Sequence, residues 1–403
     1  MPAPALRTAL LGTGFLFLFA CADQPTAPTS DALRASSRAT PFTTELLSSQ
    51  WQERTRAFVR ANAIGPLPSA RLYAAVSVAQ YRAIRAVDQQ IDVEGVSPAQ
   101  GFEAGGRARY EAHRGAVSAA SAIVLGHFLT GANTYLSQVD IDAAAGPGQA
   151  HPGFELGRAA GTVVGNAMRV HLNNDGNALP WTGTLQVGPG FWTGTPAAAH
   201  LGAMTPYLVN STSQFRPAPH VAFGSAAFNT ALAEVLTVAQ NRTPEQIAIA
   251  QFWATQVGAG ASLPGHFNKL ASDYIGETNL NERAATRVFA LMHAAQYDAS
   301  LTCFAAKYHY GLLRPNQANP AITLVIGQPM YPAYPSGHAC LMSSAAKVLG
   351  DFFPQHKVTL ENQVLEAARS RLYGGIHFMF DMEASWVLGR GVAEWAIAHE
   401  DRL

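Results

Sequence analysis

Residues 71–84 read RLYAAVSVAQYRAI, and residues 287–300 read RVFALMHAAQYDAS. Apolar residues recur at the three- and four-residue spacing of a helix face, as in Leu72, Val76 and Ala79. Both stretches begin with Arg, carry an aromatic residue two positions later and contain Ala-Gln-Tyr at the same offset. Because strand-like alternation is scarce along the chain, these stretches predict two related helices in an all-α protein.

Two further pairs of segments repeat in the same order. YEAHRGAVSAASAIVLGHF from Tyr110 resembles YPSGHACLMSSAAKVLGDF from Tyr334, and FELGRAAG from Phe154 resembles WVLGRGVA from Trp386. Three matches in register predict a duplicated helical unit, with coincidence among Ala-rich helices as the alternative. The first copy has Glu-Ala-His-Arg where the second has Pro-Ser-Gly-His. We therefore expect two similar helical bundles, of which only the second is catalytic.

Composition excludes several classes of protein. Of 403 residues, 48% are hydrophobic and 13% are charged, so the chain can bury a large core. The 27 basic and 27 acidic residues are interspersed, so we expect no nucleic-acid partner. Cys303 and Cys340 form no disulfide framework and are expected to be small core residues; a bridge between them is left open.

The N-terminus has the layout of an export signal. An arginine precedes an apolar stretch that ends in Leu-Phe-Ala-Cys at Cys21, which resembles a bacterial lipobox. Residues 1–21 are therefore predicted to be a lipoprotein-type signal peptide, with an ordinary secretory signal as the alternative. Residues 22–41, rich in Pro, Ser, Thr and Ala, are predicted to be a flexible tether. We expect an exported protein, periplasmic or at the cell surface, that contacts the membrane only through a lipid on Cys21.

The rest of the chain divides into three predicted parts. Residues 42–171 form an N-terminal helical half with a structural role, and residues 241–403 form a C-terminal helical half that carries the active site. Between them, residues 172–240 are rich in Gly, Pro, Asn and Thr and are predicted to be an ordered connector or cap with turns and short strands.

Three polar clusters lie in the second half, in AKYHYGLLRP (306–315), YPSGH (334–338) and SRLYGGIHFMFD (370–381). Each cluster alone is a weak signal, because a helix-terminal Arg-Pro, a Ser-Gly turn or a single His also occurs for structural reasons. Together they supply Lys and Arg side chains, which only donate hydrogen bonds and favour a multiply charged oxyanion.

The candidate anion-holding residues share this donor character, and they are Lys307, Arg314, Ser336, Gly337 and Arg371. Ser336 offers a hydroxyl, and Gly337 offers a backbone N–H that no side chain obstructs. The helix that begins here adds a positive N-terminus, which itself favours an anion.

Two histidines complete the candidate site. One of His338 and His377 can be a nucleophile or ligand, and the other a general acid or base near neutral pH. Asp381 lies four residues after His377, so on a helix it can fix the tautomer of that ring and raise the basicity of the free nitrogen.

The motifs Lys-x6-Arg-Pro, Pro-Ser-Gly-His and Ser-Arg-x5-His-x3-Asp resemble the signature shared by vanadium-dependent haloperoxidases and the type 2 phosphatidic acid phosphatase (PAP2) superfamily. FRPAP from Phe215, RTPEQIAIAQFW from Arg242 and PGHFN from Pro264 also look like bacterial haloperoxidase-like proteins. The resemblance covers most of the chain and implies a two-bundle α-helical fold.

This resemblance implies a role for each candidate residue. His377 would be the vanadium ligand at the axial position of vanadate, or the phosphorylated nucleophile of a phosphatase. His338 would be the acid–base group at the opposite apex, and Asp381 would act through His377. The implied cofactor is vanadate, which a phosphatase would not need, and the implied partners are hydrogen peroxide and halide, or a phosphate ester. The equatorial oxygens would be held by Lys307, Arg314, Ser336, Gly337 and Arg371.

Length, duplication and the upstream likeness favour a haloperoxidase. Only 21 residues separate Arg314 from Ser336, as in small phosphatases. Leu312 and Leu313 replace an aromatic pair common in bacterial relatives, and Tyr331 stands where chloroperoxidases carry Phe. A PAP2-type acid phosphatase and a binding protein without turnover therefore stay open as alternatives. The halide, the organic acceptor and a homodimeric assembly are also left open.

Overall fold

The computed structural model describes residues 46–93, 106–145, 151–255 and 262–403. Within these ranges the regular structure is helical, and the only strand-like pairing is an isolated bridge between Phe191 and Leu312. The all-α prediction is thus confirmed. The predicted signal peptide at 1–21 and tether at 22–41 lie outside the described residues.

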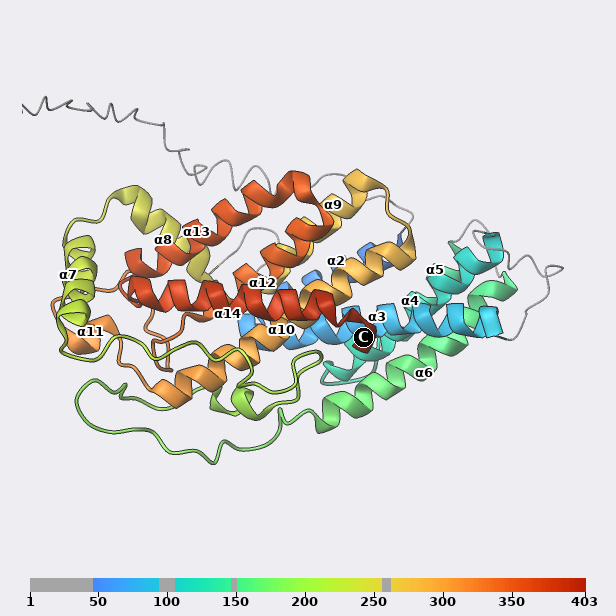
Figure 1. The fold of residues 1–403 in the computed structure, drawn as a ribbon. Coiled ribbons are helices and arrows are strands. Elements are labelled where there is room, and N and C mark those ends of the chain that lie inside the picture. The colour runs from blue at the N-terminus through green and yellow to red at the C-terminus, as the bar shows by residue number, and fades with distance from the viewer. Residues whose placement is uncertain (1–45, 94–105, 146–150, 256–261) are drawn as a thin grey trace, which may run out of the picture.

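Figure 1 shows the helices in chain order. The first-half helices are α2 (Leu47–Ala61), α3 (Pro66–Val93), α4 (Arg107–His127), α5 (Leu136–Ala144) and α6 (Pro152–Asn174). Then come α7 (Ala226–Gln240), α8 (Pro244–Thr255), α9 (Leu263–Thr278), α10 (Glu282–Tyr310) and the short α11 (Pro315–Ala318). The last three are α12 (Gly337–Phe352), α13 (Lys357–Tyr373) and α14 (Met379–Ala398).

Two trios of helices organise the body. Helices α3, α4 and α6 each pack against the other two, and so do α10, α12 and α14. The long helices α3 and α10 lie against each other where the trios meet (Figure 1). The three repeated sequence pairs fall on these six helices in the same order, which agrees with a duplicated unit; the duplication itself stays a prediction.

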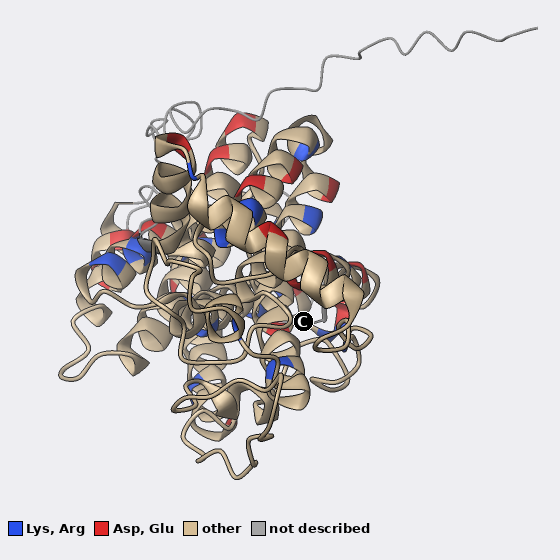
Figure 2. Cartoon of the chain, turned by 90° about the vertical axis from the view of Figure 1, so that its left-hand side faces the viewer, with Lys and Arg blue, Asp and Glu red and all other residues tan. Residues whose placement is uncertain are grey.

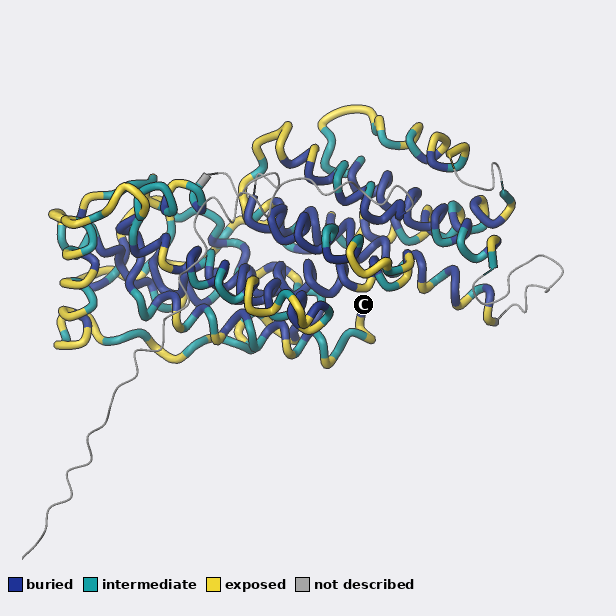
Figure 3. Tube along the Cα trace, turned by 90° about the horizontal axis from the view of Figure 1, so that it is seen from above, coloured by how far each residue is buried: buried dark blue, intermediate teal, exposed yellow. Residues whose placement is uncertain are grey.

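Both trios share one hydrophobic core. Buried residues of the first half, such as Trp51 and Val76, belong to the same cluster as Phe289 and Leu349 of the second half. Figure 3 shows the buried trace running through the long central helices, with exposed residues at loops and outer turns. The predicted halves are therefore packed as one body around a common interior.

The connector 172–240 contains more helix than its composition predicts. It includes the last residues of α6, a short 3-10 helix at Ala199–Ala203 and all of α7, while the expected short strands reduce to the one bridge. Part of it covers the end of α10, where the Trp192 N–H donates to the Gly311 carbonyl at 2.7 Å and the Leu313 N–H donates to the Gly190 carbonyl at 3.1 Å. The connector thus supports the α10–α11 junction.

Charge is dispersed over the molecule. Figure 2 shows acidic and basic residues interspersed along the helices of the face in view. In the described part of the chain, no helix combines the length and the apolar character that crossing a bilayer requires.

Candidate active site

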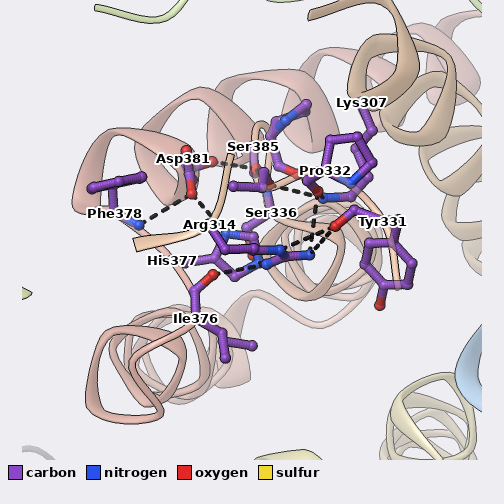
Figure 4. Close-up of polar contacts among 12 residues, drawn as sticks. Lys307, Arg314, Tyr331, Pro332, Ser336, Ile376, His377, Phe378, Asp381 and Ser385 are labelled. Carbon is purple, nitrogen blue, oxygen red and sulfur yellow. Dashed lines mark hydrogen bonds and ion pairs between the residues drawn. The ribbon is translucent and has the colours of Figure 1, made fainter. Parts of the chain in front are cut away.

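The three polar clusters come together at one end of the second trio. Lys307 lies in the last turn of α10, Arg314 precedes α11, and Arg371 lies in the last turn of α13. Ser336, Gly337 and His338 lie at the start of α12, His377 in the loop before α14, and Asp381 in the first turn of α14. Figure 4 shows five of the predicted site residues in one region, namely Lys307, Arg314, Ser336, His377 and Asp381. Arg371 and His338 are close enough for their charges to act on His377.

His377 is held in one tautomer. Its Nδ1 lies 2.7 Å from Oδ2 of Asp381, which also accepts from the Phe378 N–H at 3.1 Å. Arg314 Nη1 donates to Nε2 of His377 at 3.0 Å, so Nε2 carries the lone pair and Nδ1 the proton. The predicted i+4 pairing is present, and it aims Nε2 away from Asp381.

Burial and neighbouring cations keep His377 neutral. The ring is 3% exposed, and burial, followed by the nearby Arg314, holds the pKa of His377 well below its usual value. Burial raises the pKa of the Asp381 carboxyl to about 7, against the opposing effects of the Phe378 N–H and Lys307. In this neutral ring the Nε2 lone pair accepts from Arg314 Nη1, and it can bind an electrophilic centre once that donor turns to an anion oxygen.

His338 is held through its other nitrogen. Its Nε2 lies 2.9 Å from the Trp253 carbonyl oxygen on α8. A carbonyl only accepts, so Nε2 carries the proton and Nδ1 has the lone pair. Burial first, and then the charge of Arg371, lowers the pKa of His338 well below its usual value. Nδ1 is therefore the atom that can take up a proton.

Arg314 and Arg371 are both buried, and they differ in how many of their N–H groups already donate to backbone carbonyls. Arg314 donates from Nε and Nη2 to the Tyr331 carbonyl, at 3.1 and 2.9 Å, and from Nη1 to the Ile376 carbonyl at 2.8 Å. Arg371 donates from Nη2 to the Ala250 carbonyl at 3.2 Å, and no described residue accepts from its Nη1. Burial lowers the pKa of both guanidinium groups, but both stay charged near neutral pH.

Lys307 is placed differently from the sequence expectation. Its ammonium donates to the Pro332 and Ala333 carbonyls, both at 2.9 Å, and to the Pro335 carbonyl. Burial lowers the pKa of Lys307 to about 8. Lys307 thus fixes the turn that leads into α12, and it reaches an anion only by exchanging one of these carbonyls for an anion oxygen.

Ser336 provides the clearest sign of a ligand. Its N–H donates to Ser385 Oγ at 2.6 Å and to the Asp381 carbonyl at 3.1 Å. Its hydroxyl, in contrast, is buried and has no hydrogen-bond partner in the part of the chain that the structure describes. A buried hydroxyl is almost always satisfied, so an unpartnered one beside cationic groups indicates a site for an acceptor.

Gly337 leaves room in the same place. A Cβ at this position would lie 3.8 Å from Phe304 Cε2 and 4.0 Å from Lys307 Cε, so it would enter the space between them without a clash. Within the described residues, no group of three or more His, Cys, Asp or Glu side chains could hold a metal cation. The donors present are Lys and Arg side chains, a hydroxyl and a backbone N–H, and such donors fit an oxyanion such as vanadate or phosphate, held by one histidine.

Sequence reasoning missed three contributors. The carbonyls of Ala250 and Trp253 on α8 hold Arg371 and His338, and a backbone carbonyl leaves no residue signal. Ser385 is four residues after Asp381, so the i+4 spacing on α14 could have identified it. Its hydroxyl donates to the Asp381 carbonyl at 2.5 Å and accepts from the Ser336 N–H at 2.6 Å, and the second bond ties α14 to the start of α12.

Known proteins bear on this site in two ways. Residues 285–401 match the model of the PAP2 superfamily, and they include all eight candidate residues. No curated protein matches the chain. Among solved structures, one described as the first bacterial vanadium-dependent iodoperoxidase is similar over 87% of this chain and 95% of its own, with a TM-score of 0.69 and 22% identity.

Bacterial vanadium-dependent chloroperoxidase is similar as well. The match to its holo form includes 94% of this chain and 96% of the chloroperoxidase chain, with a TM-score of 0.64 and 13% sequence identity. The match to its apo form has a TM-score of 0.64 and 15% sequence identity. At these identities the likeness establishes the fold. Residues 285–401 therefore match the PAP2 superfamily, and the chain has the all-α fold of the bacterial vanadium-dependent haloperoxidases.

Proposed function

We propose that the protein is a vanadium-dependent haloperoxidase, which oxidises halide with hydrogen peroxide. The observation that carries the proposal is the buried hydroxyl of Ser336, which has no partner among the described residues and lies in the same region as Lys307, Arg314 and His377. A fold shared over nearly the whole chain with solved haloperoxidases supports the same branch.

Each residue has a role that follows from its geometry. Nε2 of His377 is the atom that would bind vanadium, with Asp381 holding the ring tautomer. Arg371, Ser336 and the N–H of Gly337 would hold the vanadate oxygens. Arg314 would join them when its Nη1 leaves Nε2 of His377, and Lys307 when it exchanges a carbonyl partner. When bound, vanadate supplies a Lewis acid that activates hydrogen peroxide. The net reaction, halide plus hydrogen peroxide plus a proton giving hypohalous acid and water, consumes a proton that Nδ1 of His338 can deliver.

A PAP2-type phosphatase is the second candidate, favoured by the superfamily match of residues 285–401. Here Nε2 of His377 would attack phosphorus, and the bound phosphate would raise the pKa of His338 so that it could protonate the leaving alcohol. Water would then hydrolyse the phosphohistidine. The same donors serve both reactions, because vanadate adopts the five-coordinate geometry through which phosphoryl transfer passes.

Purified protein with orthovanadate, bromide and peroxide, assayed beside hydrolysis of a phosphomonoester, tests the proposal. We expect vanadate-dependent bromide oxidation that is lost in His377→Ala and retained in His309→Ala, since His309 is exposed at the end of α10. Hydrolysis that vanadate inhibits, with no bromide oxidation, would replace the haloperoxidase by the phosphatase. The absence of both activities in a preparation that binds vanadate would leave a binding protein.

We also propose export and lipid attachment at Cys21, on the sequence alone. The test compares the membrane fraction of cells that express the full chain with that of cells that express Cys21→Ala. Release of the variant into the soluble exported fraction supports the anchor, and an unchanged distribution contradicts it.

A further inference from the structure

A cavity of about 220 Å³ lies against His338, next to the anion site. Its inner wall includes Gly337 and His338, and its outer wall includes Leu67 of the first half, in the first turn of α3. The neighbouring Pro66 and Pro68 also line it and are exposed, so the cavity opens to the surface between the two halves. The anion-holding residues all come from the second half, whereas the outer wall of the cavity comes from the first half.

We infer that the cavity binds a single-ring, phenol-type aromatic compound. The Tyr331 hydroxyl would donate a hydrogen bond to the phenol oxygen. This inference rests on the proposed function of the neighbouring site. Such a compound would be the organic acceptor of a haloperoxidase, bound beside the site rather than halogenated in solution. For the phosphatase, the same ring would be the leaving alcohol of an aryl phosphate.

The size of the cavity fits one substituted ring. An apolar protein cavity of about 150 Å³ holds benzene. The larger volume here leaves room for a hydroxyl and one further small substituent. A fused ring system or a long acyl chain would have to extend into solvent.

The walls favour an aromatic occupant. Leu263, Leu341 and Phe304 line the interior, and Phe304 and Leu341 are each 1% exposed. Phe304 meets the Tyr331 ring edge to face, with centroids 5.0 Å apart and an interplanar angle of 67°. A third ring in this cavity would meet apolar carbon and aromatic edges, an arrangement that aromatic groups prefer.

Tyr331 is held in a fixed orientation. Its ring centroid lies 5.1 Å from Lys307 Nζ and 5.3 Å from Arg314 Cζ, so two cations face the ring. Figure 4 shows the ring turned away from His377. The contacts to Lys307 and Arg314 link the cavity wall to the residues that hold the anion.

Tyr331 and His338 are the residues with polar side chains that line the cavity, and the Tyr331 hydroxyl is the one that can donate to a phenol oxygen without losing a described partner. Three other tyrosines of this region donate their hydroxyls to backbone carbonyls: Tyr308 to Ala197 at 2.6 Å, Tyr310 to Pro217 at 2.5 Å and Tyr334 to Ala218 at 2.5 Å. No described residue forms a hydrogen bond with the Tyr331 hydroxyl, and Tyr331 lines the cavity. Burial raises the pKa of Tyr331, so the hydroxyl stays protonated and can donate to a phenol oxygen.

Titration calorimetry with phenol and with toluene, on protein without vanadate or peroxide, tests the inference apart from any turnover. We expect both ligands to bind wild type. Tyr331→Phe should weaken phenol binding about two- to tenfold, the effect of one hydrogen bond, and leave toluene binding unchanged. Tyr308→Phe is the matched control, because its hydroxyl already has a protein partner.

Leu67→Trp should fill the cavity and weaken binding of both ligands more than tenfold, while Leu156→Trp on α6 should leave binding unchanged. If Leu67→Trp fails to fold, the Tyr331→Phe comparison of phenol with toluene still decides. Absence of phenol binding, or equal loss of phenol and toluene in Tyr331→Phe, would overturn the inference.

The two proposals fail separately. Phenol binding without bromide oxidation would reject the haloperoxidase proposal and retain the inferred ring site. In that case, a lower KM for an aryl phosphate than for an alkyl phosphate, reversed in Leu67→Trp, would identify the ring as a leaving group. Bromide oxidation without phenol binding would support the haloperoxidase proposal and reject the inference that the cavity binds a phenol-type ring.

Discussion

Nε2 of His338 lies 2.9 Å from the carbonyl oxygen of Trp253, a residue 85 positions earlier in the chain. This contact fixes which nitrogen carries the proton and leaves Nδ1 as the basic atom. The indole of Trp253 is itself held, since its Nε1 donates to Glu366 at 2.9 Å. The orientation of the proposed acid–base group thus depends on α8, a helix outside the three polar clusters that supply the site residues.

Replacing His338 by Ala should remove the proton transfer and leave anion binding nearly intact. We expect kcat to fall by about 10²–10⁴, the contribution of a positioned acid or base. Vanadate affinity, measured by equilibrium dialysis, should change by much less, because His377 and the arginines remain. A variant that loses vanadate binding to the same extent as kcat would show that His338 is needed to hold the anion.

Loss of the carboxylate partner of His377 should weaken vanadate binding. In Asp381→Asn the amide can still accept from Nδ1 but carries no charge, so Nε2 of His377 becomes less basic. We expect vanadate affinity to fall about 10- to 100-fold, as when other partners of ligating histidines are changed. His377→Ala, which removes the ligand itself, sets the lower limit; unchanged affinity in Asp381→Asn would contradict the proposed role.

Ser336→Ala should lower activity without changing stability. The hydroxyl has no protein partner to lose, so the free energy of unfolding should stay within about 0.5 kcal/mol of wild type. Loss of a donor to the anion should lower kcat about 10²–10³-fold. Ser344→Ala is the control, because its buried hydroxyl donates to the Leu341 carbonyl at 3.0 Å and should affect stability rather than activity. Chemical denaturation and steady-state kinetics measure the two effects.

Substitution of Gly337, at the start of α12, should also affect anion binding without affecting stability. In Gly337→Ala the new Cβ meets ordinary van der Waals distances, so Tm should be nearly unchanged while the methyl group displaces the anion. In Gly389→Ala the Cβ would lie 2.5 Å from the Cys340 carbonyl and overlap Ser343 Oγ, so the variant should lose stability. We expect weaker vanadate affinity in the first and lower Tm in the second; a large fall in Tm for Gly337→Ala would reject the interpretation.

His293 predicts a pH dependence of stability. It stacks on Tyr73, and its Nε2 accepts from Asn268 at 2.8 Å. Burial lowers the pKa of His293 to about 3, below its value of 6.5 in the unfolded chain. The unfolded chain therefore takes up a proton that the folded chain does not, and stability is lost as pH falls from 6.5 toward 3.

The test is the difference in unfolding free energy between wild type and His293→Gln. Between pH 7 and pH 5 this difference should shrink by about 2 kcal/mol, since one pKa unit corresponds to about 1.4 kcal/mol. Urea denaturation at both pH values measures it. Parallel pH profiles for the two proteins would contradict the assignment.

Much of the fold follows from local pattern. The apolar spacing in α3 and α10 predicts helices because a helix must bury one face. The connector was harder to predict, because its Gly- and Pro-rich composition does not exclude helix α7, whose N-cap Ser225 accepts from the Phe228 N–H at 3.2 Å. The contribution of the first half to the cavity could not be predicted either, since Leu67 is more than 200 residues away from the three polar clusters in sequence.

The sequence by itself determined the helices and the chemical types of the anion-holding residues, because side-chain identity and spacing carry that information. Only the tertiary structure decided which atoms are free to act. Lys307 is occupied by three carbonyls, His338 is oriented by Trp253, and the Ser336 hydroxyl has no partner among the described residues. The physical reason is that every residue carries a similar backbone carbonyl, so packing, and not residue type, selects the carbonyls that accept.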